Sequence, residues 1–338
     1  MNKILKYIFL FLIVNFSGIS GYGQDAQFSQ FYSAPLYMAP SFAGSTGGGR
    51  LITNYRDQWP KLRSTYITYS LSADYYFSKY RSGVGLLLFR DVAGKGLLNV
   101  TNLGLNYSFN FNINKKWSIR PGLQSYYYWK NIDYNILRFG DQILRSGGNG
   151  SSSSPSLEMT DLLNIEPVKH VDFTTSVLAY SDQYWIGFTI DHLMNFSKTL
   201  SSRGDYLSQR YALFGGGKYD IRGRTIKRKE ESVTGAFNFL TQDKLKYLDL
   251  GAYYTLEPVS FGLWYRGLPV FADNPNIGAI TLLFSYKYKA FRFGYSYDFT
   301  TSKLITQTGG AHEISLIYSF VEKTRKKVRH HAVPCPGM

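Results

Sequence analysis

Residues 280–299 read ITLLFSYKYKAFRFGYSYDF, and this stretch gives the strongest indication of the fold class. Successive side chains of a β-strand point to opposite faces, so the alternation of apolar and polar residues predicts two strands joined by a turn at 289–290. The polar face includes Arg292 and Asp298, whereas the other face is aromatic along both strands. Such a pair of faces is typical of a wall between lipid and a polar lumen. The apolar face consists of Ile280, Leu282, Phe284, Tyr286, Tyr288, Phe291, Phe293, Tyr295, Tyr297 and Phe299.

The composition of the whole chain favours the same class. Of 338 residues, 18% are charged and 17% are aromatic, and the mean hydropathy is −0.21. A helical membrane protein would contain several apolar runs of about 20 residues. A soluble enzyme would carry about a quarter charged residues. Few charges with moderate hydropathy favour a transmembrane β-barrel, because its lumen side dilutes the apolar signal.

Alternating segments recur from residue 49 to residue 320, which we take as the bounds of the barrel. Leu103, Leu105 and Tyr107, for example, alternate with glycine and asparagine. An even number of strands is expected for a single-chain bacterial barrel, and the count here is about fourteen. The expected strands lie at 49–57, 64–77, 82–92, 97–112, 116–130, 170–180, 183–192, 206–218, 231–240, 247–256, 258–266, 278–288, 290–299 and 311–320.

The N-terminus carries an apolar run of a different kind. Two lysines precede apolar residues 7–16 and small residues follow, which predicts a signal peptide over residues 1–23, cleaved before Gln24. The run is too short to cross a bilayer as a helix. The net charge of +15 does not indicate nucleic acid as a partner, because an exported chain rarely meets it and the basic residues fall at turns and in the tail.

The expected connections alternate in length along the chain. Short turns lie near 78–81, 114–116, 181–183, 257–258 and 289–290, and longer loops lie at 131–169, 193–205, 267–277 and 300–310. Short periplasmic turns and long outer loops are the usual asymmetry of an outer-membrane barrel, so an even strand count places both termini in the periplasm. The loop at 131–169 is long for a connector, and its sequence leaves open a binding loop or a flexible one.

Residues 24–48 lack strand alternation and are the candidate for a plug inside the barrel. Their aromatic side chains would pack against the wall, so that the barrel is not an open pore. Polar residues expected on the lumen side either pair with one another or line a channel. They are Arg120, Gln124, Asp191, Arg266, Arg292 and Asp298.

The sequence contains no pattern that indicates catalysis, a cofactor or a metal. The five histidines stand outside GxSxG and HExxH settings, and no phosphate-binding glycine loop occurs. A single cysteine, Cys335, excludes an intrachain disulfide framework. His312 adjoins Glu313, but neighbours in a strand point to opposite faces. We therefore expect a protein that is not an enzyme.

Three motifs near the N-terminus resemble those of one family. QFSQFY, PLYMAPSFAG and NYRDQWP are similar, in order and spacing, to the QFSQFY, PLYLNPAFAG and NYRNQWP patterns of PorP/SprF outer-membrane proteins of type IX secretion and gliding motility. The chain departs from the pattern at Ala39 and Asp57. We expect the motif residues to seat the plug and the first strand. They are Gln27, Phe28, Ser29, Gln30, Phe31, Tyr32, Pro35, Leu36, Tyr37, Pro40, Phe42, Gly44, Asn54, Tyr55, Arg56, Gln58, Trp59 and Pro60.

The resemblance implies a fold and a function. The implied fold is a fourteen-stranded barrel like that of the long-chain fatty acid transporter, with an N-terminal plug. The implied function is an outer-membrane component that supports secretion or surface anchoring of a specific cargo, such as a gliding adhesin, by binding the C-terminal domain of that cargo. A transporter of a hydrophobic small molecule and a general porin or structural barrel remain the alternatives.

Residues 321–338 form a basic tail that is similar to the His/Pro/Cys-containing C-terminus of the family. Its composition predicts disorder when free. Two interpretations stay open, a solvated tail near anionic lipid headgroups and a contact for a periplasmic secretion component. The candidate contact residues are Arg325, Lys326, Lys327, Arg329, His330, Pro334, Cys335 and Pro336.

Overall fold

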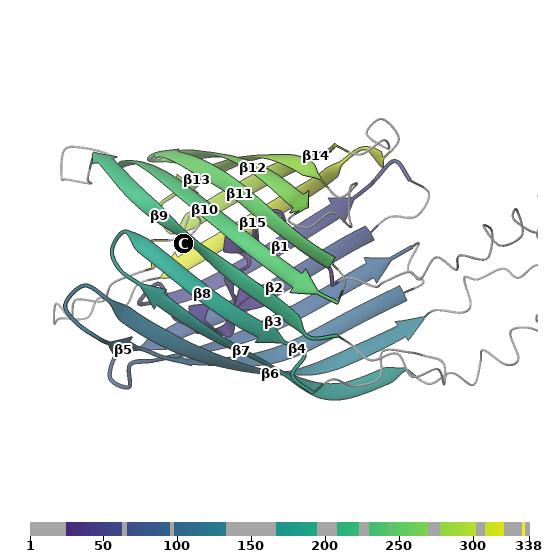
Figure 1. The fold of residues 1–338 in the computed structure, drawn as a ribbon, viewed down its shortest axis with the longest axis horizontal. Coiled ribbons are helices and arrows are strands. Elements are labelled where there is room, and N and C mark those ends of the chain that lie inside the picture. The colour runs from purple at the N-terminus through teal and green to yellow at the C-terminus, as the bar shows by residue number, and fades with distance from the viewer. Residues whose placement is uncertain are drawn as a thin grey trace, which may run out of the picture.

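A computed structural model describes residues 25–62, 66–94, 98–132, 167–194, 208–222, 230–243, 245–269, 278–301, 308–320 and 333–334. Within these residues, fifteen strands form one antiparallel sheet that curls into a barrel (Figure 1). The predicted signal peptide and most of the loop at 131–169 lie outside the described residues. The strands are β1 (Gly49–Gln58), β2 (Tyr66–Phe77), β3 (Ser82–Ala93), β4 (Leu98–Phe109), β5 (Phe111–Asn112), β6 (Ser118–Ile132), β7 (Val168–Tyr180), β8 (Tyr184–Asp191), β9 (Arg210–Arg222), β10 (Glu231–Gln242), β11 (Leu245–Leu256), β12 (Val259–Pro269), β13 (Ala279–Tyr288), β14 (Phe291–Thr300) and β15 (Ala311–Phe320).

The barrel is closed by two pairings. β1 pairs with β15, so the first and last strands of the wall meet, and β4 pairs directly with β6. The two-residue strand β5 pairs with the start of β6 and lies outside this circuit. The remaining strands of the described chain make a closed antiparallel wall of fourteen. The predicted fold class is thus confirmed.

The hairpin at 280–299 has the register that the alternation predicts. Ile280 faces Phe299, Phe284 faces Tyr295 and Tyr288 faces Phe291 across β13 and β14. These side chains are exposed on the outer surface, whereas Thr281 and Asp298 are buried on the lumen side. The outer apolar face continues around the wall, whereas the inner face is polar on some strands and carries buried apolar side chains on others.

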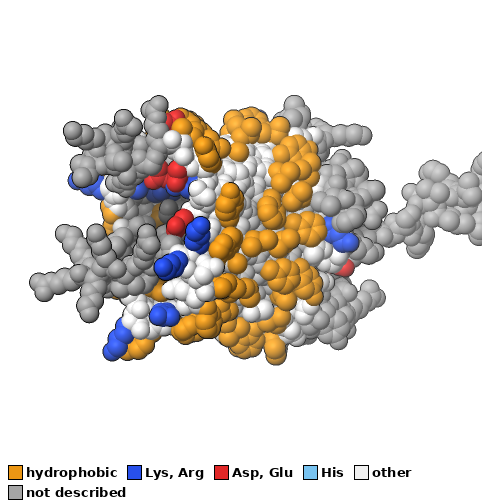
Figure 2. Space-filling model, turned by 60° about the vertical axis from the view of Figure 1, so that its left-hand side comes forward, with side chains coloured by type: hydrophobic (Ala, Val, Ile, Leu, Met, Phe, Trp, Pro, Cys, Tyr) orange, Lys and Arg blue, Asp and Glu red, His pale blue; other side chains and the backbone are white. Residues whose placement is uncertain are grey.

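The outer surface carries the banding of a membrane protein. Aliphatic side chains such as Leu71, Leu105 and Leu282 occupy the middle of the strands, and aromatic side chains lie exposed near both ends. Figure 2 shows these hydrophobic side chains gathered over the middle of the barrel. Aromatic girdles at both interfaces with an apolar band between them are characteristic of outer-membrane barrels. Aromatics next to the short turns are Phe77, Tyr80, Tyr107, Phe111, Tyr184, Tyr219, Tyr288, Phe291 and Phe320.

Three short helical elements lie inside the barrel. They are η1 (Phe31–Ser33), α2 (Pro35–Met38) and η2 (Pro40–Phe42), and η2 contacts β4, β6 and β7. Proline begins both α2 and η2, a position where its missing N–H costs no helical hydrogen bond. Among the described residues, no helix is long and apolar enough to cross a membrane.

Residues 25–48, which we call the plug, run through the lumen from one end of the barrel to the other. We call the end with the short connections at 78–81, 181–183 and 289–290 the turn end, and the opposite one the loop end. Asp25 contacts His192, which follows β8 at the loop end. At the turn end, Ser108 donates a hydrogen bond to the Ala43 carbonyl, and β1 then begins opposite Phe320.

Candidate functional site

The first part of the plug is bonded to β14 and β15. The backbone N–H groups of Ser29 and Gln30 donate to the Glu313 carboxylate at 2.6 and 3.0 Å. The Gln30 side-chain amide donates to Ser296 Oγ and accepts from Ser315 Oγ. Glu313 is only 1% exposed, and a buried carboxylate is tolerated when hydrogen bonds satisfy it. The QFSQ motif therefore fixes the plug by pairing with one defined position of the wall.

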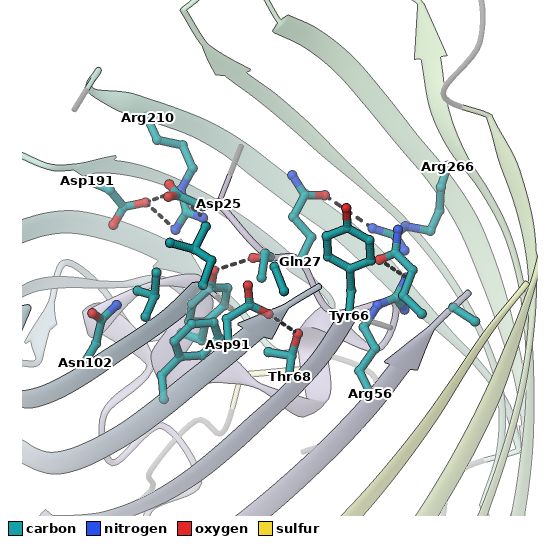
Figure 3. Close-up of a pocket in the computed structure, with 18 of the residues that line it drawn as sticks. Asp25, Gln27, Arg56, Tyr66, Thr68, Asp91, Asn102, Asp191, Arg210 and Arg266 are labelled. Carbon is teal, nitrogen blue, oxygen red and sulfur yellow. Dashed lines mark hydrogen bonds and ion pairs between the residues drawn. The ribbon is translucent and has the colours of Figure 1, made fainter. Parts of the chain in front are cut away.

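Two arginines from strands four positions apart in the wall complete this contact. Arg56 of β1 lies 2.8 Å from Asp298 and 3.2 Å from Glu313, and it also donates to Ser29 Oγ. Arg266 of β12 donates to Ser29 Oγ at 2.9 Å and lies 3.2 Å from Asp298. Figure 3 shows the two arginines reaching toward each other. One plug serine thus joins β1, β12 and β14.

A second ion pair holds the plug at the turn end. Arg50 Nε lies 2.9 Å from Asp74 Oδ1, and both side chains are 0% exposed. The other Asp74 oxygen accepts the Gly44 N–H at 2.7 Å, and Arg50 Nη2 donates to the Phe42 carbonyl at 3.4 Å. This pair therefore clips the last turn of the plug to β1 and β2.

Glycines in the wall let the plug backbone approach closely. A Cβ on Gly122 of β6 would lie 2.2 Å from the Ser41 backbone nitrogen, and one on Gly83 of β3 would lie 2.0 Å from the Ala43 carbonyl oxygen. Real Cβ atoms do not make such contacts. Glycine in a strand often marks the place where another backbone comes near.

The other side of the plug is apolar. Phe31 packs edge-on against Trp264 at 4.7 Å between ring centroids, and Phe42 stacks on Phe214 at 5.5 Å. These residues belong to one buried group, which we call the apolar cluster. Its members are Phe31, Tyr32, Met38, Ala39, Phe42, Leu178, Tyr180, Trp185, Phe214, Ala236, Tyr253, Trp264, Leu283 and Val333.

At the loop end, the start of the plug is held by a charged group around Asp25. Its Oδ2 lies 2.9 Å from His192 Nε2 and accepts a hydrogen bond from Gln242 at 2.9 Å. His192 Nδ1 lies 2.8 Å from Asp172. Burial disfavours the charged imidazolium, but the nearby carboxylates of Asp25 and Asp172 outweigh it and raise the pKa of His192 to about 9. Burial also opposes ionisation of Asp25, yet attraction to His192 and Arg210 lowers the pKa of that carboxyl below its ordinary value.

A cavity of about 760 Å³ occupies the loop end of the lumen, beside the start of the plug (Figure 3). We call it the vestibule. Its wall on β3 and β4 includes apolar side chains such as Leu87, Phe89 and Val100, whereas arginines and carboxylates line the other side. Within the described residues, the Tyr247 hydroxyl and Asn102 Oδ1 have no hydrogen-bond partner. Vestibule residues include Asp25, Gln27, Arg56, Trp59, Leu87, Phe89, Asp91, Val100, Asn102, Tyr128, His192, Arg210, Tyr247 and Arg266.

The structure places the six polar residues expected in the lumen on the inner side of the wall. Arg120 donates to the Ala43 carbonyl at 3.0 Å and lies over the Tyr180 ring. Asp191 accepts from Arg210 at 2.7 Å. Gln124 and Asp191 line the vestibule with Arg266 and Asp298, and Arg292 alternates with outward-facing phenylalanines.

Some motif residues contact the plug, whereas others lie on the outer face or line the vestibule. Asn54 of β1 donates to the Ser33 carbonyl at 3.2 Å, which ties the third motif to the plug. Tyr55 instead lies on the outer face, where its ring is 5.3 Å from that of Tyr69. Trp59 lines the vestibule and packs edge-on against Tyr66. Of the candidate tail contacts, only Pro334 is described, and it is half-buried.

Several residues that hold the plug carry no signal in the sequence alone. Asp25, Asp74, Asp172 and Arg210 lie in segments without a recognisable motif, and their partners are distant in the chain. The exception is Glu313, because strand alternation assigns it to the face opposite His312. The structure has His312 bonded to Tyr295 on the outer face and Glu313 inside. Among the described residues, no group of three or more His, Cys, Asp or Glu side chains could hold a metal ion.

The fold and its interior define a class of protein, the plugged outer-membrane β-barrel. The family model for the type IX secretion system membrane protein PorP/SprF matches residues 20–318. The chain belongs to this family, as its N-terminal motifs indicate. A search of curated proteins finds no match.

The barrel is also similar to solved structures at low sequence identity. The CymD monoaromatic hydrocarbon channel is 14% identical, with 89% of this chain and 96% of that chain covered and a TM-score of 0.49. The Pseudomonas putida toluene transporter TodX is 11% identical, with 85% and 92% covered and a TM-score of 0.45. The Acinetobacter baumannii outer membrane protein Omp33 is 8% identical, with 81% and 98% covered and a TM-score of 0.43.

Proposed function

We propose that this type IX secretion component supports secretion or surface anchoring of a specific cargo by binding the C-terminal domain of that cargo. The observation that carries the proposal is the filled lumen. The plug is bonded to β1, β2, β12, β14 and β15, and the apolar cluster fills the space beside it. A barrel with such an interior suits a receptor that holds its partner better than a conduit that passes it.

The vestibule is the part of the lumen that the proposal assigns to the cargo. It lies at the loop end, which faces the cell exterior if both barrel termini are periplasmic, as the strand parity predicts. Its volume of about 760 Å³ falls in the range of ligand-binding sites. Charged side chains that line it, among them Asp91 and Arg266, can bond an incoming chain.

One observation favours the second candidate, a transporter of a hydrophobic small molecule. Leu87, Phe89 and Val100 form an apolar strip along one side of the vestibule. Such a strip suits an apolar ligand as well as a peptide side chain. The two functions differ in what remains bound to the protein when it is extracted from its own membrane.

The experiment is a pull-down of the tagged barrel from its native cells. Recovery of one large secreted protein, lost when the C-terminal domain of that protein is removed, supports the cargo function. Recovery of a small apolar molecule alone supports transport. Val100→Trp should fill the vestibule and reduce recovery of the cargo, while Leu103→Trp on the outer face of the same strand is the matched control.

We propose a second contact, between the basic tail and a periplasmic secretion component. Five lysines and arginines within seven residues supply the positive charge for an acidic partner. Replacing all five with glutamine should leave the barrel inserted and reduce recovery of the partner; unchanged recovery refutes the contact. The five are Lys323, Arg325, Lys326, Lys327 and Arg329.

A further inference from the structure

Polar contacts hold the plug on both sides, and on the side of β7 to β13 the plug also packs in the apolar cluster. On the side of β1, β2 and β15 the contacts are hydrogen bonds and ion pairs, such as Arg50 with Asp74. On the side of β7 to β13, hydrogen bonds such as that from the Ser41 N–H to Ser176 Oγ are joined by the contacts of the apolar cluster. A valine from outside both the plug and the wall, Val333, is part of that cluster.

Val333 is deeply buried although only five residues follow it. Its side chain is 4% exposed, comparable to wall residues of the cluster such as Trp185, and the following Pro334 is half-buried. β15 ends with Phe320 beside the first residue of β1, at the turn end. Twelve residues join Phe320 to Val333, and that length of chain spans up to about 45 Å when extended. Val333 therefore lies within the lumen, and the twelve residues before it are long enough to reach that place from the turn end.

The sequence of residues 321–338 divides into a charged stem and an apolar tip, and only the tip suits a buried position. Between 321 and 331, eight of eleven residues are charged or histidine, whereas the last seven residues read AVPCPGM and carry no ionisable side chain except the single thiol. A charged stem in the lumen would leave ions unpaired among aromatic rings. An apolar tip, by contrast, gains from leaving water and fills space that would otherwise stay empty.

We propose that the C-terminal tip of this chain, centred on Val333, is an internal ligand of the barrel. It binds in the apolar cluster against the plug and the walls of β7 to β13. The plug and the tip thus fill the lumen together, the plug by polar and apolar contacts and the tip by apolar contact. This inference is independent of which cargo the protein serves.

Thiol accessibility tests the proposal directly. Val333→Cys in a Cys335→Ser background is treated with a membrane-impermeant maleimide in isolated outer membranes open on both faces. The control is Lys79→Cys in the same background, since Lys79 lies exposed in the turn between β2 and β3 at the same end of the barrel. A buried thiol reacts only when its site opens, so we expect labelling at least about tenfold slower at 333 than at 79. Equal rates would overturn the proposal.

A second pair of variants tests the proposal without a cysteine at position 333. Val333→Asp should expel the tip, because a carboxylate in an aromatic cluster is costly, whereas Val333→Ile should retain it. The native thiol of Cys335 reports the difference, with faster labelling in the aspartate variant than in the isoleucine variant. Heat-modifiable migration on gels confirms that both barrels are folded. Folded barrels with the same labelling rate in both variants would contradict a bound tip.

Discussion

Removal of the carboxylate of Asp74 is expected to destabilise the protein strongly. The Arg50–Asp74 pair is fully buried, and Asp74 also accepts the Gly44 N–H of the plug. Asp74→Ala leaves the Arg50 guanidinium buried without its counter-charge, which costs about 3–5 kcal/mol. An apolar replacement of both partners, Arg50→Met with Asp74→Leu, removes the uncompensated charge and should recover most of that loss.

The assay is equilibrium unfolding by urea in detergent micelles, followed by tryptophan fluorescence. Asp220→Ala is the control, because its pair with Lys218 is 23% and 44% exposed and should contribute less than about 1 kcal/mol. If Asp74→Ala and Asp220→Ala had the same free energy of unfolding, the predicted cost of the unpaired Arg50 would be refuted. It would mean that the ion pair does not fasten the plug to the wall.

Three further predictions concern the plug. Gly122→Ala should loosen it and speed its proteolysis, because the new Cβ falls 2.2 Å from the Ser41 nitrogen; Gly235→Ala, whose Cβ meets nothing within 4 Å, should match the wild type. The pKa of His192 is raised to about 9, so its stabilisation is complete below about pH 6.5 and is lost as the pH rises through 9. His192→Gln should abolish that decline in the urea midpoint. Arg56→Ala should reduce the folded, heat-modifiable barrel, since Ser29, Asp298 and Glu313 lose a shared partner; normal assembly with cargo missing from the cell surface would instead make Arg56 a recognition residue.

The wall could be predicted from sequence because its information is local. Each strand repeats its pattern every two residues, so 280–299 specifies both its strands and the face that meets lipid. The same rule separates Glu313 from His312. Strand ends were less predictable, as in β9, which runs from Arg210 to Arg222 where 206–218 was expected. Turn and loop residues there carry no periodic signal.

The interior was predictable only in part. The aromatic and proline content of residues 24–48 indicates packing, and the structure has these residues inside the barrel. Their partners could not be predicted, because a plug without periodic structure has no register with the wall. Ser29 and Glu313 are 284 residues apart, and no local pattern joins them. The position of Val333 depends on the shape of the space between the plug and β7 to β13, which exists only in the folded barrel.

Planar-bilayer recording from the purified, folded protein tests most directly whether the plug and the apolar cluster fill the lumen. We predict no sustained ion conductance from the intact chain at moderate voltage. Asp74→Ala, which weakens the seat of the plug, should show intermittent openings. A steady open channel of porin size in the wild-type protein would contradict the account, because ions would then pass through space that the structure assigns to residues 25–48.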